Sequence, residues 1–273
     1  MRKGTGMRET KAIILAAGKG TRMGSELPKV LHTVAGRPMI EHSIERARQA
    51  GVGPIVVVVG YRAEAVRDAL KSAGVQFAEQ ADQRGTGHAV AQATPFLEGF
   101  DGNVLVLYGD MPLLRPSTIR SLADTLEDTG AAAVVLTIEL DNPPAFGRIV
   151  RDGDGRVIRM VEARDASVEE LAIREVNVGA YCFDAVALLW ALDRLRNDND
   201  QGEYYLTDVI EILVSAGRPV ETVVAGTLEE TLGINDAFHL QFAERLGAIE
   251  YAENHYQLID VVAAMERDRQ QGA

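Results

Sequence analysis

The sequence predicts an α/β fold: a Rossmann-like, doubly wound and mostly parallel sheet with a mixed β insertion and a C-terminal helical arm. Short, unbroken apolar runs rich in Val and Ile recur in the first half of the chain, as expected for strands buried on both faces. Helical patterns separate these runs, which favours right-handed βαβ units. After Asp141 the pattern changes to shorter strands and a hairpin signal, which predicts the mixed insertion.

The expected strands of the first half are apolar runs, several of which are followed directly by a glycine. They span residues 11–17, 54–59, 74–78, 104–108 and 131–140. The helical patterns between them span residues 39–51, 63–72, 87–97 and 116–128. Strand and helix therefore alternate from residue 11 to residue 140, which is the order expected of a parallel sheet.

The second half is predicted to begin with a hairpin. Two short strands, 147–150 and 156–161, flank the turn sequence Asp152-Gly153-Asp154-Gly155. A strand over 174–183, helices over 185–195 and 206–216 and a strand over 220–224 follow. A last helical stretch begins near Asn235 and continues, with breaks, toward Arg269. We therefore expect one domain over residues 11–235 and a helical arm over residues 236–273, which packs on its own domain or forms a homo-oligomer.

Composition excludes several classes of protein. Of the 273 residues, 47% are hydrophobic and 25% are charged, which is ordinary globular usage and rules out disordered, collagen-like and rod-like chains. The one cysteine, Cys182, excludes an intramolecular disulfide framework and a cysteine-based zinc site, and it predicts a core position and a cytoplasmic location. No apolar run approaches the ~18 residues of a membrane span, so we expect no membrane partner.

Charge predicts the kind of ligand. The net charge of −12 argues against nucleic acid as a partner, because neutralising phosphates over a broad surface needs a basic face. Residues 18–37 differ, with four cations and the single anion Glu26: the cations are Lys19, Arg22, Lys29 and Arg37. A small basic patch in an acidic protein suits a compact phosphorylated ligand, although a solvated loop is the alternative.

Polar and glycine-rich sequences follow three of the expected strands. They are Gly18-Lys19-Gly20, Glu79-Gln80 and Gly109-Asp110. Ligands of open parallel sheets bind outside the carboxyl ends of the strands, so we expect these segments to share one site. Asp110 directly follows a buried strand, where a carboxylate is costly unless it is paired or binds a metal.

The glycine loop fits neither common nucleotide-binding fingerprint. Met23 stands where the dinucleotide motif needs its third glycine, and the chain has no P-loop sequence. Two nearby cations, Arg22 and Lys29, indicate a phosphate cradle instead. A glycine turn required only for packing is the alternative.

Ordered motifs carry a family resemblance. They span residues 15–23, 27–32, 85–90, 108–110, 146–149, 175–179, 201–208 and 233–235. This series resembles the sugar-1-phosphate nucleotidyltransferases, and most closely the uridylyltransferase domain of the bifunctional GlmU family. The resemblance implies a nucleotidyltransferase that joins UTP and N-acetylglucosamine-1-phosphate into UDP-N-acetylglucosamine and pyrophosphate, with Mg²⁺ as cofactor.

The resemblance also implies roles for individual residues. Arg22 and Lys29 are the expected catalytic cations, and Asp110 and Asn235 are the expected Mg²⁺ ligands. For Asp110 a turn or cap position is the alternative, and for Asn235 a helix N-cap. Gln80 is expected to read uracil together with the backbone near Ala17-Gly18 and Gly85-Thr86.

The full set of expected substrate-binding residues is Leu15, Ala16, Ala17, Gly18, Lys29, Gln80, Gln83, Gly85, Thr86, Tyr108, Gly109, Asp110, Gly147, Glu162, Asn177, Tyr205, Thr207 and Asn235. Of these, Gly147, Glu162, Asn177, Tyr205 and Thr207 are expected to bind the acetamido sugar and its phosphate. His88 lies in a helical pattern and is expected to pack or cap rather than to catalyse.

The chain departs from the family in two places. Ala145-Phe146 stands where the family usually has Gly-Tyr, which alters the rim of the expected sugar pocket. No hexapeptide repeat follows Asn235, so we expect no left-handed β-helix acetyltransferase domain and no acetyl transfer. Two other functions stay open: transfer to a different sugar-1-phosphate or from another nucleotide, and a catalytically silent nucleotide-sugar-binding protein.

Overall fold

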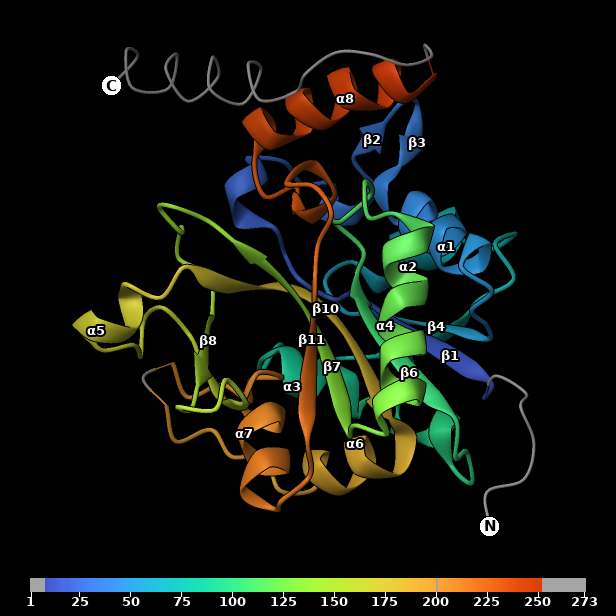
Figure 1. Cartoon of the computed structure of the whole chain (residues 1–273). Helices are drawn as coiled ribbons and strands as arrows, with labels where there is room; N and C mark the ends of the chain where they lie inside the picture. Colours follow the sequence, from blue (N-terminus) through green and yellow to red (C-terminus); the bar gives the residue numbers. More distant parts are fainter. Residues whose placement is uncertain (1–7, 200, 252–273) are drawn as a thin grey trace.

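The computed structural model describes residues 8–199 and 201–251, and side chains as far as residue 246 (Figure 1). Its main path of strands has the order β11-β7-β10-β6-β1-β4-β5. The strands are β1 (Thr10–Ala16), β4 (Ile55–Val59), β5 (Gln76–Glu79), β6 (Asn103–Tyr108), β7 (Ala133–Glu139), β10 (Glu175–Asp184) and β11 (Val220–Val224). The pairings are parallel except that β10 runs antiparallel to β6 and β7. The predicted α/β class with a mostly parallel sheet is confirmed.

The predicted hairpin is also confirmed. It consists of β8 (Arg148–Arg151) and β9 (Val157–Val161), which pair antiparallel, and β8 joins the edge of β10 at Val176. Gly155, with a φ of 81°, supplies the left-handed residue that this turn needs. A second, two-residue hairpin, β2 (Thr33–Val34) and β3 (Arg37–Pro38), was missed because strands so short carry no periodicity.

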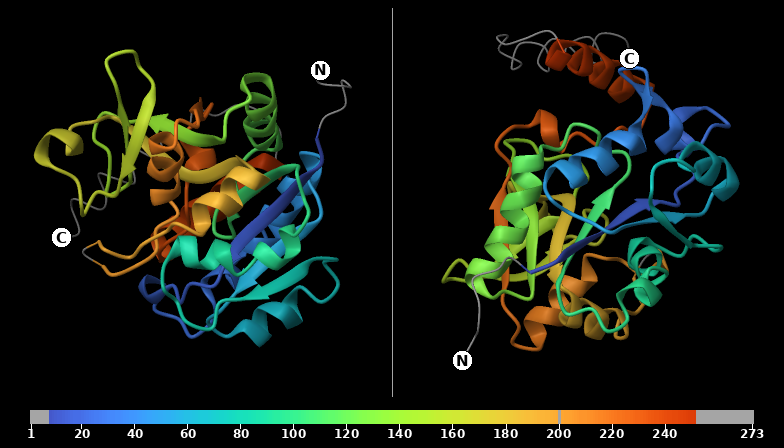
Figure 2. Two further views of the ribbon diagram at one scale, coloured as in Figure 1. Left: turned by 90° about the horizontal axis from the view of Figure 1, so that it is seen from below. Right: turned by 90° about the vertical axis from the view of Figure 1, so that its right-hand side faces the viewer.

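Helices cover both faces of the sheet (Figure 2). One face packs against α1 (Met39–Gln49), α2 (Ala63–Ala69) and α4 (Pro116–Thr129), and the other against α3 (Thr86–Ala91), α6 (Ala185–Leu192) and α7 (Asp208–Ser215). Successive β1 residues alternate between the two apolar cores: Ala12 and Ile14 belong to the first, Ile13 and Leu15 to the second. A strand buried on both faces has to be apolar at every position, which is why it reads as an unbroken run.

Several predicted helix ends were wrong: the helices predicted over 63–72 and 185–195 end at Ala69 and Leu192. The helix predicted over 87–97 ends at Ala91, and a 3₁₀ helix, η3 (Thr94–Leu97), follows, because Pro95 has no N–H to continue the α-helical ladder. The last helix, α8 (Ala237–Tyr251), begins after Asp236, whose Oδ1 accepts the main-chain N–H of His239 at 2.9 Å. Asp236 therefore occupies the capping position, and the alternative that Asn235 is the N-cap is wrong.

The described part of the helical arm packs on its own domain. Phe242, Ala243 and Leu246 are buried, and α8 lies beside the β2–β3 hairpin (Figure 1). Ala243 shares a small apolar cluster with Val34 and with Ile234. The part of the arm predicted to continue toward Arg269 lies outside the described residues. The division of the chain into a domain over 11–235 and an arm over 236–273 therefore stays a prediction.

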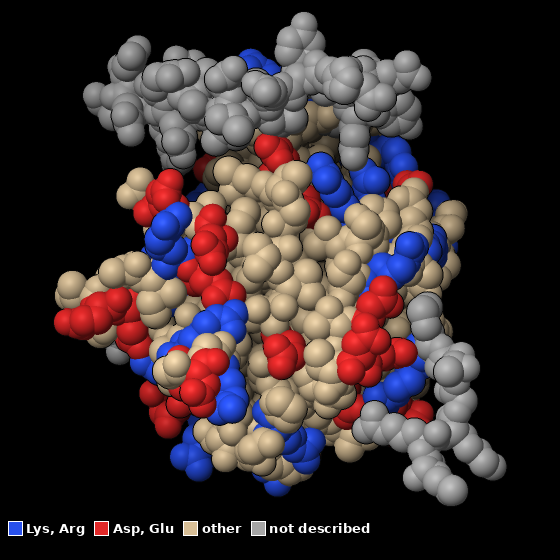
Figure 3. Space-filling model, viewed as in Figure 1, with Lys and Arg blue, Asp and Glu red and all other residues tan. Residues whose placement is uncertain are grey.

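The surface of the described residues carries charges of both signs. On the face seen in Figure 3, Lys and Arg side chains are interspersed with Asp and Glu around a central area of uncharged residues. Within the described residues, none of the helices combines the length and the apolar character that a membrane crossing requires.

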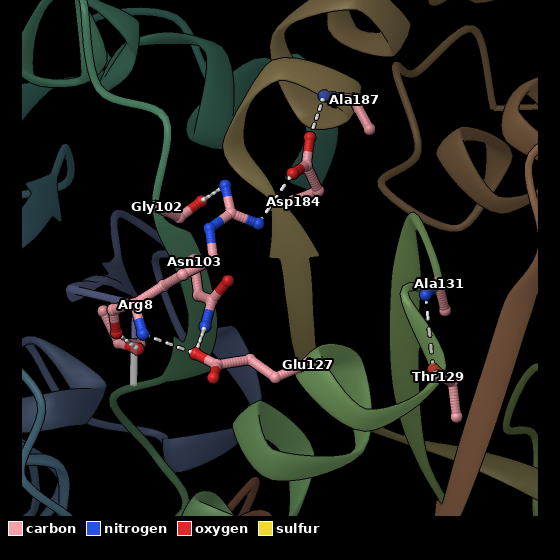
Figure 4. Close-up of polar contacts among 9 residues, drawn as sticks. Arg8, Gly102, Asn103, Glu127, Thr129, Ala131, Asp184 and Ala187 are labelled. Carbon is pink, nitrogen blue, oxygen red and sulfur yellow. Dashed lines mark hydrogen bonds and ion pairs between the residues drawn. The ribbon is translucent and has the colours of Figure 1, made fainter. Parts of the chain in front are cut away.

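A set of polar contacts closes the amino end of β6 (Figure 4). The Arg8 guanidinium donates to Asp184 Oδ2 at 3.0 Å, and the Arg8 main-chain N–H donates to Glu127 Oε1 at 2.8 Å. Asn103 Nδ2 donates to the same Glu127 oxygen at 2.8 Å. Asp184 also caps α6 by accepting the Ala187 N–H at 2.9 Å. These contacts join the start of β1 to α4, β6 and α6.

Candidate active site

The loops that follow the parallel strands meet at one edge of the sheet, as predicted. The main-chain N–H of Gly109, after β6, donates to Leu15 O in β1 at 2.9 Å. Beyond β1, Ala17 O accepts the N–H of Tyr61, which follows β4, at 3.0 Å. The side chains of Leu15, Ala16 and Ala17 are buried, so only their backbone is available to a ligand.

Four predicted residues, Arg22, Lys29, Asp110 and Asn235, form what we call the cation–oxygen cluster. Lys29 Nζ forms a short ion pair with Asp110 Oδ2 and donates to Asn235 Oδ1 at 3.0 Å. Arg22 Nη2 donates to the same Asn235 oxygen at 3.1 Å. The Lys29 and Asp110 side chains are only 16% and 11% exposed, whereas Arg22 is exposed. Two oxygens and two cations from distant parts of the sequence thus meet at a half-open site.

Two 3₁₀ helices place the cations. Arg22 lies on η1 (Thr21–Met23) and Lys29 begins η2 (Lys29–Leu31). Gly20 is left-handed, with a φ of 63°, and a Cβ there would lie 2.6 Å from the Cβ of Lys29, so packing requires this glycine. Gly18 differs, because its φ is not left-handed and a Cβ would meet no described heavy atom within 4 Å. Packing therefore explains Gly20 and leaves Gly18 unexplained.

Gln80 is buried at the end of β5, with 3% exposure. Its Nε2 donates to Gly85 O at 3.0 Å and lies 3.0 Å from His88 Nδ1. A carbonyl only accepts, so the contact with Gly85 O fixes which end of the amide is nitrogen. Both amide hydrogens then have partners in the chain. A glutamine amide can in general offer a base both a donor and an acceptor, but here Gln80 has only the acceptor Oε1 to offer.

His88 supports this amide, which agrees with the expectation that it packs rather than catalyses. Its Nδ1 lies 3.0 Å from Gln80 Nε2, and an amide nitrogen only donates, so Nδ1 accepts the second Gln80 hydrogen. Gln83, the other predicted glutamine, is exposed and donates to Gln80 O at 3.3 Å. Of the two glutamines, Gln80 is held in one orientation.

The loop Gly85-Thr86-Gly87 packs against the chain near Tyr204. Gly85 has a φ of 108°, and a Cβ would lie 2.5 Å from Tyr204 O. Gly87 N–H donates to Tyr204 O at 2.8 Å, and Leu206 N–H donates to Thr86 Oγ1 at 3.0 Å. Gly85 and Thr86 were expected at the uracil and Tyr205 and Thr207 at the sugar, and the structure joins these two segments directly.

Glu162 and Thr207 are brought together as predicted. The Thr207 hydroxyl donates to Glu162 Oε1 at 3.1 Å. Burial raises the pKa of Glu162, and this hydrogen bond opposes the rise. Burial, with nearby acidic charges, also raises the pKa of Tyr205 to about 12, so its hydroxyl stays protonated at neutral pH. The Thr207 hydrogen is used by Glu162, so the Tyr205 hydroxyl is the donor and the Glu162 carboxyl the acceptor that can bind sugar hydroxyls.

Asn177 is used differently from the prediction. Its Nδ2 donates to Tyr181 Oη at 2.6 Å, and its Oδ1 accepts the Gly179 N–H at 2.9 Å. Both contacts lie within the irregular part of β10, between Asn177 and Tyr181. The side chain therefore stabilises this bulge. One Nδ2 hydrogen and one Oδ1 lone pair are left to bind a ligand.

Tyr108 lies between the two halves of the candidate site. Its side chain packs within 3.2 Å of the position that a Cβ on Gly179 would take. Burial raises the pKa of Tyr108, and the charges of Glu162 and Asp110 raise it further. The charges of one sugar-side residue and of one residue of the cation–oxygen cluster thus both act on this phenol.

A buried arginine shapes the rim at residues 143–147. Arg148 is 3% exposed, and its guanidinium donates to the carbonyl oxygens of Pro143, Pro144, Phe146 and Leu171. Gly147 O accepts the Asn177 N–H at 2.9 Å, which ties the rim to β10. Phe146, where the sequence departs from the family, is 37% exposed. The backbone of this rim is thus fixed while its aromatic side chain faces outward.

Residues 12–153 match the family described as the MobA-like NTP transferase domain. The chain belongs to this family. It is 49% identical over 241 residues to the bifunctional protein GlmU of Pelobacter propionicus, covering 88% of this chain and 52% of that protein. It is 50% identical over 240 residues to the bifunctional protein GlmU of Geobacter metallireducens, covering 88% of this chain and 50% of that protein. The resemblance to the GlmU family is confirmed.

The chain spans about half the length of these curated relatives. Among solved structures, it is similar to a UDP-glucose pyrophosphorylase complexed with UDP-glucose, with a TM-score of 0.69. That likeness covers 90% of this chain and 100% of the other at 17% identity, so it supports the nucleotidyltransferase fold alone.

Proposed function

We propose that this chain transfers UMP from UTP to N-acetylglucosamine-1-phosphate, giving UDP-N-acetylglucosamine and pyrophosphate. The observation that carries the proposal is the cation–oxygen cluster at the carboxyl edge of the sheet. Displacement at the α-phosphorus of UTP needs aligned phosphates and neutralised charge rather than a covalent nucleophile. Arg22 and Lys29 supply positive charge at the same half-open site where Asp110 and Asn235 present oxygens.

In this reaction a phosphate oxygen of the sugar-1-phosphate forms the new bond to the α-phosphorus, and the bond to pyrophosphate breaks. We assign Arg22, which is exposed, to the departing pyrophosphate. We assign Lys29, which is largely buried, to the phosphates that become joined. The unexplained Gly18 supports this assignment, because a glycine with open space around it lets phosphate oxygens approach the backbone closely.

The cluster fits a divalent cation, for which we propose Mg²⁺. Asp110 Oδ2 and Asn235 Oδ1 both contact the same ammonium nitrogen, so they already converge on one positive centre. Among the residues that the structure describes, no group of three His, Cys, Asp or Glu side chains forms a metal site by itself. Mg²⁺ favours few protein oxygens together with substrate phosphates. When bound, it would neutralise charge on the triphosphate.

Gln80 is proposed to select the base. Its Oε1, which has no hydrogen-bond partner among the described residues, would accept the N3–H of uracil, whereas cytosine has a lone pair at N3 and would be repelled. The amide cannot turn to suit cytosine without breaking its contacts with Gly85 O and His88 Nδ1. The fixed amide therefore supports UTP as the nucleotide.

The sugar side is proposed to consist of Gly147, Glu162, Asn177, Tyr205 and Thr207, next to Tyr108. A second substrate class has one observation in its favour: the exposed Phe146 at the rim differs from the family pattern. That change supports a test of other sugar-1-phosphates, and glucose-1-phosphate is the first alternative substrate to compare. A cytoplasmic location is part of the proposal and is supported by the buried, unpaired Cys182.

The test is pyrophosphate release from a panel of four nucleoside triphosphates, each with N-acetylglucosamine-1-phosphate, glucose-1-phosphate and glucosamine-1-phosphate, with Mg²⁺ and with chelator. We expect the highest kcat/KM for UTP with N-acetylglucosamine-1-phosphate and loss of activity with chelator. A higher value for another sugar phosphate would replace the substrate. No turnover with any pair, together with nucleotide-sugar binding, would support the silent binding protein.

A further inference from the structure

Glu230 is a buried carboxylate outside the cation–oxygen cluster. It is 1% exposed and lies in η4 (Glu229–Thr231). Its Oε1 accepts the N–H groups of Gly226 at 2.9 Å and Thr227 at 3.3 Å. Its Oε2 accepts the Thr118 hydroxyl at 2.6 Å and the Arg115 N–H at 3.3 Å. Four donors thus satisfy a carboxylate that would otherwise be costly to bury.

These contacts join two segments that both end in the candidate site. Residues 110–115 run from Asp110 to the N-terminus of α4, and residues 230–235 run from η4 to Asn235. At the site, Ile234 N–H donates to Asp110 O at 2.9 Å. At the other end, Glu230 binds Arg115 and Thr118. The two segments therefore lie side by side in opposite directions and are joined at both ends.

The middle of this pair is apolar. Leu113 and Leu232 pack on the same small cluster as the fully buried Ile234. Apolar packing resists separation of the segments but gives no directional register. The hydrogen bonds at the two ends supply that register, because each has a preferred distance and angle.

We propose that Glu230 is a positioning residue that sets the distance between the oxygens of Asp110 and Asn235. It touches neither oxygen and acts through the 110–115 and 230–235 segments. This inference rests on the proposed function, because it assumes that these two oxygens hold the divalent cation. Helix capping alone is the competing role, since Arg115, the cap residue of α4, has no side-chain cap and a carboxylate at a helix N-terminus stabilises it.

The test compares Glu230→Gln with Glu229→Gln. Glu229 is the adjacent acidic residue, is only partly buried and has no side-chain hydrogen bond within the described residues. In Glu230→Gln an amide NH₂ replaces one acceptor, so at least one of the four donors loses its partner. Thr118→Val removes one donor to the carboxylate, and Thr118→Ser restores it.

Three quantities are measured on each full-length variant: Tm, the Mn²⁺–UTP dissociation constant by water-proton relaxation, and the Mg²⁺ concentration that gives half-maximal pyrophosphate release. For Glu230→Gln we expect weaker Mn²⁺–UTP binding and a higher half-saturating Mg²⁺ concentration, each by roughly 10-fold. Thr118→Val should shift both in the same direction by less. Thr118→Ser and Glu229→Gln should match the unmodified chain.

A lower Tm for Glu230→Gln and Thr118→Val with unchanged metal binding in the folded protein would overturn the inference and leave helix capping. If the unmodified chain releases no pyrophosphate with any substrate but Mn²⁺–UTP binding still depends on Glu230, the proposed function fails and the positioning role stands. If Glu230→Gln does not fold, the Thr118 pair decides by the same two metal measurements.

Discussion

The two ends of strand β6 both carry polar clusters, and they are built differently. At the amino end, Asn103 begins the strand and binds Glu127, which also binds Arg8 (Figure 4). At the carboxyl end, Asp110 follows the strand and pairs with Lys29. The amino-end groups belong to the ends of strands and α-helices, whereas the cation–oxygen cluster comes from loops and 3₁₀ helices.

This difference shows what distinguishes a binding site from a structural contact. Arg8 and Glu127 connect elements that the apolar cores already hold, so their partners are fixed parts of the fold. Lys29 and Asp110 lie where parallel strands end and loops begin, and an entering ligand could exchange with either partner. A polar side chain at the end of a strand therefore does not by itself indicate a binding site. It does so when a ligand can take the place of its partner within the protein.

The largest expected effect comes from breaking the carboxyl-end cluster. Asp110→Ala should lower kcat/KM for UTP and N-acetylglucosamine-1-phosphate by roughly 100-fold, because it removes a proposed metal ligand and the partner of Lys29. The fold should survive, since Asp110 lies outside the apolar cores, but the Tm should fall because the largely buried Lys29 loses its charge partner. Pyrophosphate release and thermal unfolding check both statements. Turnover close to that of the unmodified chain would remove Asp110 from the proposed metal site.

A smaller effect is expected for base selection at the same edge. Gln80→Ala should lower kcat/KM for UTP by roughly 10-fold, because it removes the acceptor proposed for uracil N3–H, and it should narrow the preference for UTP over CTP. Gln49→Ala, which changes an exposed glutamine at the end of α1, is the control. If the Gln80 variant has the same kcat/KM as the unmodified chain, both for UTP and for CTP, another group reads the base.

The amino-end cluster should give the opposite result. Asn103→Ala removes a fully buried side chain and its bond to Glu127, so the free energy of unfolding should fall by about 1–3 kcal/mol. Its kcat and KM should not change. Denaturant unfolding and pyrophosphate release measure the two. A large loss of activity in the folded variant would show that the two ends of β6 are coupled.

The smallest effect concerns pH. Burial, with the charges of Glu211, Glu162 and Asp165, raises the pKa of Asp208 to about 6. The folded chain therefore holds a proton that the unfolded chain releases at lower pH, so this group lowers stability as pH rises toward about 6 and adds no further loss above it.

Asp208→Asn removes this titration. Its Tm should decline less than that of the unmodified chain between pH 4 and pH 6, and it should be the more stable of the two at pH 7. Asp68→Asn, on the exposed side of α2, is the control. A variant with the same pH dependence as the unmodified chain would show that Asp208 does not titrate in this range.

Local patterns determined most of the secondary structure. The strand predicted over 220–224 has those bounds in the structure, and the runs at 11–17 and 104–108 differ from β1 and β6 by about one residue. β1 and β6 are buried on both faces, so nearly every residue of these two runs is apolar. β11 lies at the edge of the sheet, and its Glu221 and Val224 are exposed. Charge and position after a strand likewise indicated Arg22, Lys29 and Asp110, and the family resemblance added Asn235 to the set.

Tertiary structure alone decided the partners. No local pattern indicates that β10 inserts antiparallel between β6 and β7, that Asp236 rather than Asn235 caps α8, or that Gln80 uses both amide hydrogens within the chain. Glu230 carried no signal, because an acidic pair beside a loop is usually solvated, and its partner Thr118 lies 112 residues away. A hydrogen bond depends on where two groups meet in space, and over such separations only the packed sheet and its helices determine that.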